Sequence, residues 1–229
     1  MSSTRATNGA IDLPALRVAY LDALVAGDAT RARFVIDDAV GRANGPIAQL
    51  YTDVLAPVME DVGHLWADGD ITVGHEHYAT VITQDVISRL GARWRRPPDS
   101  GRLAIVSATA GERHALGSQI VTAFLEAAGW EVLALGADMP ARDLAVLAEL
   151  ERPDVVALST SLREGLPSVA ESLILLGRLE PRPLLVVGGR AWSDGGPEHA
   201  RTLGADALVL DPRDLVALLQ ERFPPVEDD

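Results

Sequence analysis

The second half of the chain contains five short runs of aliphatic residues, and this repetition limits the fold more than any other feature. The stretches between the runs are each long enough for one helix. Apolar runs without polar alternation are typical of strands covered on both faces, as in parallel sheets. Five such units predict a flavodoxin-like, doubly wound α/β sheet of five parallel strands, which binds ligands at the carboxyl ends of its strands. The runs are 103–106, 131–135, 154–158, 184–187 and 206–210.

The first half of the chain has the periodicity of helices. Its best segment follows the i, i+3, i+4 spacing of an amphipathic helix, and Pro57 within it predicts a kink or a local break. Weaker periodic segments cover about 12–26 and 29–42, and a fourth helix is predicted over 72–94 with Thr72 as its N-cap. Four helices with short connections predict a four-helix bundle. The apolar positions of the best segment are Ile47, Leu50, Tyr51, Val54, Leu55, Val58, Val62 and Leu65.

Between the two halves, residues 95–101 contain two prolines and a glycine, which end the helix and predict a domain boundary. The expected organisation is a flexible N-terminus over 1–11, a helical-bundle cap over 12–94, a linker over 95–101, a sheet domain over 102–222 and an acidic tail over 223–229.

Composition excludes several classes of function. The chain has no cysteine, so thiolate metal sites, iron–sulfur clusters and cysteine nucleophiles are excluded. The net charge of −13 argues against direct binding to nucleic acid, which needs a basic face. No apolar run approaches the length of a bilayer span, and the N-terminus lacks a signal-peptide core, so we expect a cytoplasmic protein with no membrane partner. No nucleophile–base pair is visible, so a conventional enzyme is not expected.

The segment Gly111–Gly117 follows the first aliphatic run and carries His114. The imidazole can coordinate a metal, the carboxylate of Glu112 can hold its second nitrogen, and Gly117 lets backbone approach a large planar ligand. The alternative is a solvated histidine in a turn at a strand end.

Polar and small residues end two further strands at the same predicted edge of the sheet. Ser159, Thr160 and Ser161 follow the third run, and Gly188–Gly189 follows the fourth. The first loop matches neither a dinucleotide nor a Walker fingerprint, and Ser159 stands where a phospho-receiver domain needs aspartate. One imidazole, several hydroxyls and two glycines suit a metal-centred ligand with a long polar appendage.

With these residues in place, the second half resembles the cobalamin-binding domain of methionine synthase, corrinoid carrier proteins and cobalamin-dependent mutases, over about residues 101–222. That family carries a DxHxxG…SxL…GG pattern. Glu112 replaces the aspartate of the first element, and Ser161 replaces the leucine of the second. The resemblance implies that His114 replaces dimethylbenzimidazole as the lower cobalt ligand, with Glu112 as its partner. It also implies that Ser159 and the two glycines line the tunnel for the cofactor tail.

In the helical half, Trp66 is followed after nine residues by Glu76–His77. This W-x9-EH spacing resembles the cap of CarH-type cobalamin photoreceptors. The resemblance implies that the indole packs against the adenosyl group of adenosylcobalamin and that Glu76 and His77 help to hold it. The alternative is a core tryptophan beside a solvated helix start.

Two departures from that pattern matter. Full-length members place a DNA-binding domain before the cap, and we expect none here. Ala67 stands where well-known members have the histidine that captures cobalt after light, so His77 and His75 are the candidate upper ligands, ahead of His64. A zinc site on His75, Glu76 and His77 is disfavoured because histidines two apart on a helix diverge by about 200°.

The sequence therefore predicts a stand-alone adenosylcobalamin photoreceptor that signals to a protein partner such as a transcription regulator. A light-dependent oligomer is compatible with this role. The alternatives are a corrinoid methyl-carrier protein for a methyltransferase and a cobalamin storage or delivery module.

Overall fold

The computed structural model describes residues 11–43, 47–193 and 196–224. Residues 1–10 of the expected flexible N-terminus and residues 225–229 of the expected tail lie outside this range. The chain divides into two compact units between Trp94 and Arg95, and each is described by itself. None of the helices in the described part of the chain has both the length and the apolar character needed to cross a bilayer.

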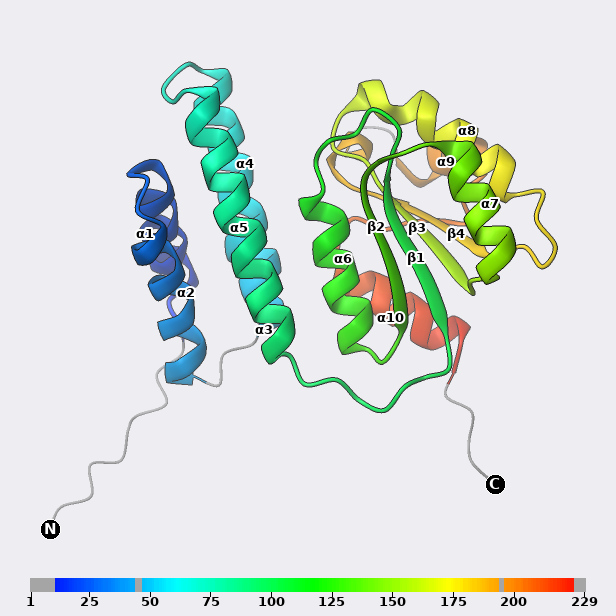
Figure 1. The fold of residues 1–229 in the computed structure, drawn as a ribbon, viewed down its shortest axis with the longest axis horizontal. Helices are drawn as coiled ribbons and strands as arrows, with labels where there is room; N and C mark the ends of the chain where they lie inside the picture. Colours follow the sequence, from blue (N-terminus) through cyan, green and yellow to red (C-terminus); the bar gives the residue numbers. More distant parts are fainter. Residues whose placement is uncertain (1–10, 44–46, 194–195, 225–229) are drawn as a thin grey trace, which may run out of the picture. The chain divides into compact units, whose positions relative to one another are not determined.

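The first unit consists of helices, and its last two, α4 and α5, run side by side in Figure 1. The predicted third helix is a continuous run of α3, a π-helical stretch (η1) and α4, so the predicted four-helix bundle is confirmed. The elements are α1 (Leu13–Val25), α2 (Ala29–Ala43), α3 (Ile47–Gln49), η1 (Leu50–Leu55), α4 (Ala56–Ala67) and α5 (Val73–Arg93).

The disturbance predicted at Pro57 takes the form of the π-helical stretch directly before it. A proline inside a helix lacks its N–H and crowds the preceding turn, and a wider π turn relieves this conflict. The stretch is also well anchored, because Tyr51 is fully buried and its hydroxyl donates to the Ile87 carbonyl of α5 at 2.7 Å. The helix therefore continues through Pro57 instead of breaking.

A buried polar chain links three helices of this unit. The Tyr20 hydroxyl lies 3.0 Å from Thr83 Oγ1, which in turn donates to Met59 Sδ at 3.2 Å. Tyr20 is fully buried. Burial, partly offset by the Thr83 hydrogen bond and by Arg33, raises the pKa of Tyr20 to about 12.

The second unit is a five-stranded parallel sheet with the order β2-β1-β3-β4-β5, so the predicted flavodoxin-like sheet is confirmed. Apolar residues of α6 and α10 pack on one face, and those of α7, α8 and α9 pack on the other (Figure 1). The strands are β1 (Leu103–Thr109), β2 (Glu131–Met139), β3 (Val155–Ser159), β4 (Leu184–Gly188) and β5 (Ala207–Leu208). The helices are α6 (Leu116–Ala127), α7 (Ala141–Glu151), α8 (Leu166–Leu176), α9 (Gly196–Thr202) and α10 (Pro212–Arg222), with 3₁₀ turns η2 (Arg163–Gly165) and η3 (Arg190–Trp192).

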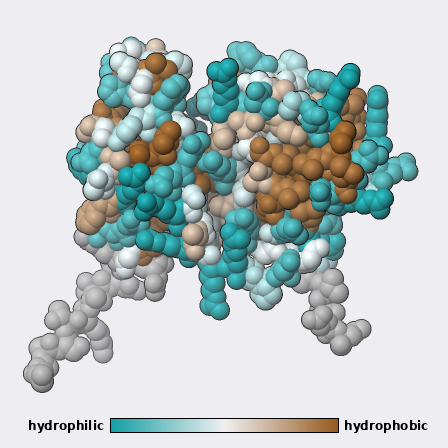
Figure 2. Space-filling model, viewed as in Figure 1, coloured by the Kyte–Doolittle hydropathy of each residue, from teal (hydrophilic) through white to brown (hydrophobic). Residues whose placement is uncertain are grey.

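Strand β2 departs from the expectation that all five strands are covered on both faces. It lies at an edge of the sheet, and Ala134, Ala137 and Asp138 are exposed. Apolar surface gathers in Figure 2 where Figure 1 places β2 and α7, and Val146 and Leu150 of α7 are exposed. An aliphatic run therefore does not by itself distinguish an edge strand from a central one.

The segment predicted as a linker has no regular structure between α5 and β1. It is tied to the second unit, because Arg96 pairs with Glu126 at 2.6 Å and the Ser100 amide donates to the Gly129 carbonyl at 2.8 Å.

We predict that Tyr20→Phe changes stability in a pH-dependent way. Near neutral pH the variant should lose about 1 kcal/mol of unfolding free energy because Thr83 loses a partner. A raised pKa favours the neutral phenol in the folded state, so wild-type stability should be lost as the pH rises from 10 towards about 12, by about 2–3 kcal/mol in all. The variant should lack this contribution.

The measurement is urea unfolding at a series of pH values from about 9 to about 11.5. Tyr78→Phe, at a tyrosine whose side chain is exposed, is the matched control. Equal alkaline slopes for wild type and Tyr20→Phe would contradict the prediction.

Candidate functional site

Three small residues lie in one row across the carboxyl ends of three adjacent strands. Ala108 of β1 pairs with Ser159 of β3, and Ser159 pairs with Gly188 of β4. This row lies on the face that α6 and α10 cover, because Val106, Ala157 and Val186 precede it by two residues and belong to that core. The sequence pointed to Ser159 and Gly188. It missed Ala108, whose only signal was its place at the end of the first run.

Helix α6 closes over this row at Gly117. A Cβ at Gly117 would lie 2.5 Å from Ser159 Oγ, so a larger residue there would force the Ser159 side chain to move. The row and Gly117 thus place only small groups where the start of α6 meets the sheet.

The glycine pair after β4 is required by the fold itself. A Cβ at Gly188 would collide with the Val209 carbonyl oxygen, and one at Gly189 would collide with the Thr160 carbonyl oxygen. Gly189 also has a φ of 98°, which strongly favours glycine. The pair brings the loops after β3 and β5 close to β4, whatever else it does.

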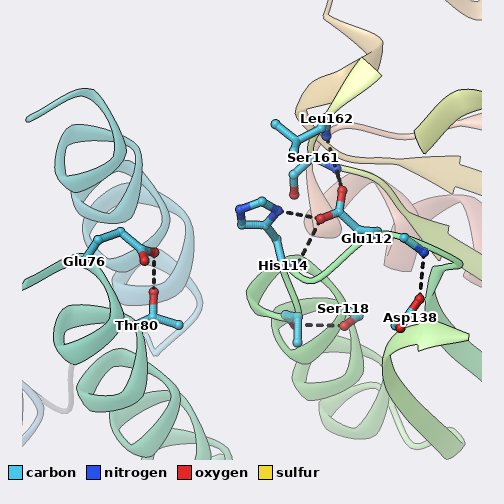
Figure 3. Close-up of polar contacts among 10 residues, drawn as sticks. Glu76, Thr80, Glu112, His114, Ser118, Asp138, Ser161 and Leu162 are labelled. Atoms are coloured by element: carbon cyan, nitrogen blue, oxygen red, sulfur yellow. Dashed lines mark hydrogen bonds and ion pairs between the residues drawn. The ribbon is translucent and has the colours of Figure 1, made fainter. Parts of the chain in front are cut away.

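Glu112 accepts hydrogen bonds from two loops of this unit (Figure 3). One carboxylate oxygen accepts from His114 Nδ1 at 2.5 Å and from the His114 amide at 2.9 Å. The other accepts from the amides of Ser161 at 2.6 Å and Leu162 at 3.2 Å. The Glu112–His114 contact is therefore direct. Ser161 contributes its backbone N–H, which does not depend on the side chain at that position.

These bonds decide the charge of Glu112, whose side chain is 1% exposed. Burial by itself would raise its pKa, but hydrogen bonds from the His114 ring, the His114 amide and the Ser161 amide lower the pKa to about 2. The group is a carboxylate at neutral pH and accepts the proton of His114 Nδ1. In a neutral imidazole the lone pair is then on Nε2, which is the atom that would ligate a metal.

The possible metal ligands around His114 suit a metal ion that already carries most of its ligands. The part of the chain that the structure describes holds no group of three or more His, Cys, Asp or Glu side chains able to bind an ion. One imidazole with a half-exposed side chain is, however, sufficient as an axial ligand when a macrocycle supplies the equatorial ones. The residues around His114 therefore fit a corrin better than a bare ion.

In the helical unit, the residues of the W-x9-EH pattern lie at the facing ends of two consecutive helices. Trp66 is near the end of α4, and Glu76 and His77 are in the first turns of α5. The Trp66 side chain is 49% exposed, so the alternative of a core tryptophan is wrong. Glu76 accepts from Thr80 Oγ1 at 2.9 Å through one oxygen (Figure 3) and lies 2.6 Å from His77 Nδ1 through the other.

The other histidines have other contacts. His75 Nδ1 accepts from the Thr72 amide at 3.2 Å and lies 2.8 Å from the Thr72 hydroxyl, so it takes part in capping α5. The sequence predicts Thr72 as the N-cap but does not indicate this role of His75. His64 is exposed on α4, and the ring of His199 packs edge-on against Trp192 with centroids 5.9 Å apart. The His77 side chain is 74% exposed.

Comparisons with known proteins bear on both units. A family model described as B12 binding domain matches residues 102–218, and a second model with the same description matches residues 16–90. The chain is 32% identical to the HTH-type transcriptional repressor CarH of Myxococcus xanthus over 76% of its own length. The match spans 58% of that relative, little more than half of its length.

Two other similar proteins are described as corrinoid proteins and not as a transcriptional repressor. The chain is 29% identical to dimethylamine corrinoid protein 3 of Methanosarcina acetivorans, over 79% of this chain and 84% of the relative. The monomethylamine corrinoid protein of Methanosarcina barkeri has a similar fold, with a TM-score of 0.78 and 19% identity over 91% of this chain and 99% of that one.

We predict that Glu112→Gln destabilises the sheet unit at neutral pH. The glutamine amide cannot accept all four hydrogen bonds, and its buried NH2 group would face N–H groups that are themselves donors. The free energy of unfolding should therefore fall by about 1–3 kcal/mol. The pKa of Glu112 is lowered by folding, so its contribution is present above pH 4.5 and is lost as the pH falls towards about 2.

The difference between wild type and Glu112→Gln in urea unfolding should therefore shrink below about pH 4.5. Glu149→Gln, at an exposed position on α7, controls for the loss of one negative charge. A difference that stays constant with pH, or no difference at neutral pH, is the result that the prediction does not allow.

Proposed function

Because the chain belongs to the family of B12-binding domain proteins, we propose that it binds adenosylcobalamin as a light-sensitive switch and signals to a protein partner in transcriptional regulation. The observation that carries the proposal is Trp66, a half-exposed indole at the end of α4, separated by nine residues from Glu76–His77. An exposed aromatic plane on a helical cap is suited to contact an apolar group on the upper face of a bound corrin.

Below the corrin, this chain's residues would orient and hold the lower ligand. Nε2 of His114 would ligate cobalt, and Glu112 would fix the ring and its tautomer through Nδ1. The row of Ala108, Ser159 and Gly188 beneath Gly117 would accommodate the tail of the cofactor. When bound, adenosylcobalamin supplies a cobalt–carbon bond that light can break.

Above the corrin, Trp66 would pack against the adenosyl group. The Glu76 carboxylate, held by Thr80, and His77 would hydrogen-bond its ribose. Of the two candidate upper ligands after light, His77 would be better suited than His75. The His75 ring caps α5, whereas the His77 side chain is 74% exposed. Ala67 offers no ligand of its own.

The output would pass through a protein, because a net charge of −13 disfavours a direct contact with nucleic acid. A change in the helical unit after loss of the adenosyl group, or a light-dependent oligomer, would present a different surface to that partner.

The second candidate is a corrinoid methyl-carrier protein. It is favoured by the match to a dimethylamine corrinoid protein over 84% of that protein's length. A carrier must open the upper face of its corrin to a methyltransferase, and an indole packed on that face would hinder access.

We predict a light response that depends on Trp66. Protein loaded with adenosylcobalamin in the dark should convert under green light to a stable bound product and change its hydrodynamic radius. Trp66→Ala should lose most of the change in radius while still binding cobalamin, because His114 remains. Phe34→Ala removes an exposed aromatic side chain from α2 and should behave as wild type.

Absorption spectra and gel filtration before and after light provide the measurement. Photolysis no faster than that of the free cofactor, with an unchanged radius, would refute the photoreceptor. Methyl transfer from methylcobalamin-loaded protein to a thiol by an added corrinoid methyltransferase would then support the carrier.

We further predict that His114 is the lower ligand. The EPR spectrum of protein-bound cobalt(II) should show a nitrogen triplet from an axial ligand, and ¹⁵N-histidine labelling should turn it into a doublet. Dimethylbenzimidazole ligation would leave the triplet unchanged. His114→Ala should lose the histidine signal, whereas His199→Ala, on α9, should keep it.

A further inference from the structure

The carboxyl end of β2 is irregular next to the loop that carries His114. Val106 pairs with Ala134, but Ser107 pairs with Gly136 and Thr109 with Met139, so β2 contains extra residues at two places. Bulges of this kind re-aim side chains and are frequent near functional sites. Here the second bulge contains Asp138.

Asp138 has a backbone conformation that is costly for a residue other than glycine. Its φ is 56°, in the left-handed region, where aspartate is tolerated better than most residues but still at a cost. Such conformations persist only where surrounding contacts enforce them.

Those contacts join Asp138 to the loop before His114. The Asp138 amide donates to the Glu112 carbonyl at 2.9 Å, and its Oδ1 accepts from the Gly111 amide at 2.7 Å (Figure 3). Asp138 is therefore hydrogen-bonded to both ends of the Gly111–Glu112 segment. We name this pair of hydrogen bonds the Asp138 latch.

The latch complements the contacts on the other side of Glu112. The amides of Ser161 and Leu162 hold the Glu112 carboxylate from the end of β3, while Asp138 holds the Glu112 backbone from the end of β2. Two further bonds of the loop, from the Glu112 amide to Thr109 and from the His114 amide to Glu112, are internal to it.

We infer that Asp138 is a positioning residue for the His114 imidazole: by fixing the backbone of the Gly111–Glu112 segment, it sets the direction from which the Glu112 carboxylate meets His114 Nδ1. The inference rests on the proposed ligation of cobalt by His114, and it adds a residue from the exposed edge strand to the support of that ligand. Residues that orient a metal ligand through another group affect metal affinity by about 10- to 100-fold.

The variants distinguish the effect of the side-chain oxygen of Asp138 from the effect of its left-handed backbone conformation. Asp138→Asn keeps an oxygen acceptor and tolerates the left-handed region, Asp138→Ala removes the acceptor, and Asp138→Gly removes the acceptor while relieving the backbone. Glu131→Ala, at the exposed opposite end of β2, is the matched control for charge.

Two measurements are made on each full-length variant. The first is hydrogen exchange of the Gly111 amide without cofactor. The second is the affinity for hydroxocobalamin, with the fraction bound in the histidine-ligated form read from EPR after reduction to cobalt(II). We expect Asp138→Ala and Asp138→Gly to accelerate Gly111 exchange and to weaken cobalamin binding, each by about tenfold. Asp138→Asn should restore both, and Glu131→Ala should match wild type.

Asp138→Gly with wild-type exchange and affinity would overturn the inference, since the acceptor would then be unimportant. Wild-type affinity and histidine ligation in Asp138→Ala would overturn it as well. If Asp138→Ala does not fold, the comparison of Asp138→Gly with Asp138→Asn decides in the same way. If the wild-type protein does not bind cobalamin through His114, the proposed function is rejected. Faster Gly111 exchange in Asp138→Ala and Asp138→Gly would still support the latch in that case.

Discussion

A carboxylate with almost no exposed surface must find hydrogen-bond donors for both of its oxygens, and the site depends on how Glu112 finds them. One oxygen is used by the ring and amide of His114, and the other by amides that follow β3. The charge is thereby stabilised in a buried position, with a pKa of about 2. A single side chain thus joins the loop after β1 to the end of β3 and fixes the orientation of the histidine.

The parallel sheet makes this arrangement possible because it brings the ends of β1, β3 and β4 into register. Ala108, Ser159 and Gly188 place only small groups where α6 meets the sheet, while Glu112 is held by the loop that follows β3. Gly188 and Gly189 are required for the close approach of neighbouring backbone, so their presence alone would not have indicated a ligand.

Much of the fold and part of the site could be predicted from the sequence. Aliphatic runs located the strands, and the 3.6-residue period located the helices, because burial imposes both patterns. The spacing of Glu112 and His114 after a strand indicated their pairing. Asp138 could not be found in this way, because a bulge interrupts the two-residue period of a strand and leaves no pattern of its own. His75 was missed as a capping residue because glutamate or glutamine usually fills that position.

His114 and His77 differ in how the protein holds their rings. His114 is held at Nδ1 by a carboxylate that is fully supported by donors, which suits a permanent ligand. His77 Nδ1 lies 2.6 Å from a Glu76 oxygen, and the His77 side chain is mostly exposed. A ligand that must remain bound in every state gains from a fixed ring, whereas one that binds only after a group has left gains from a mobile ring. In the switch that we propose, a constant lower ligand and a changing upper ligand would therefore make different demands on His114 and His77.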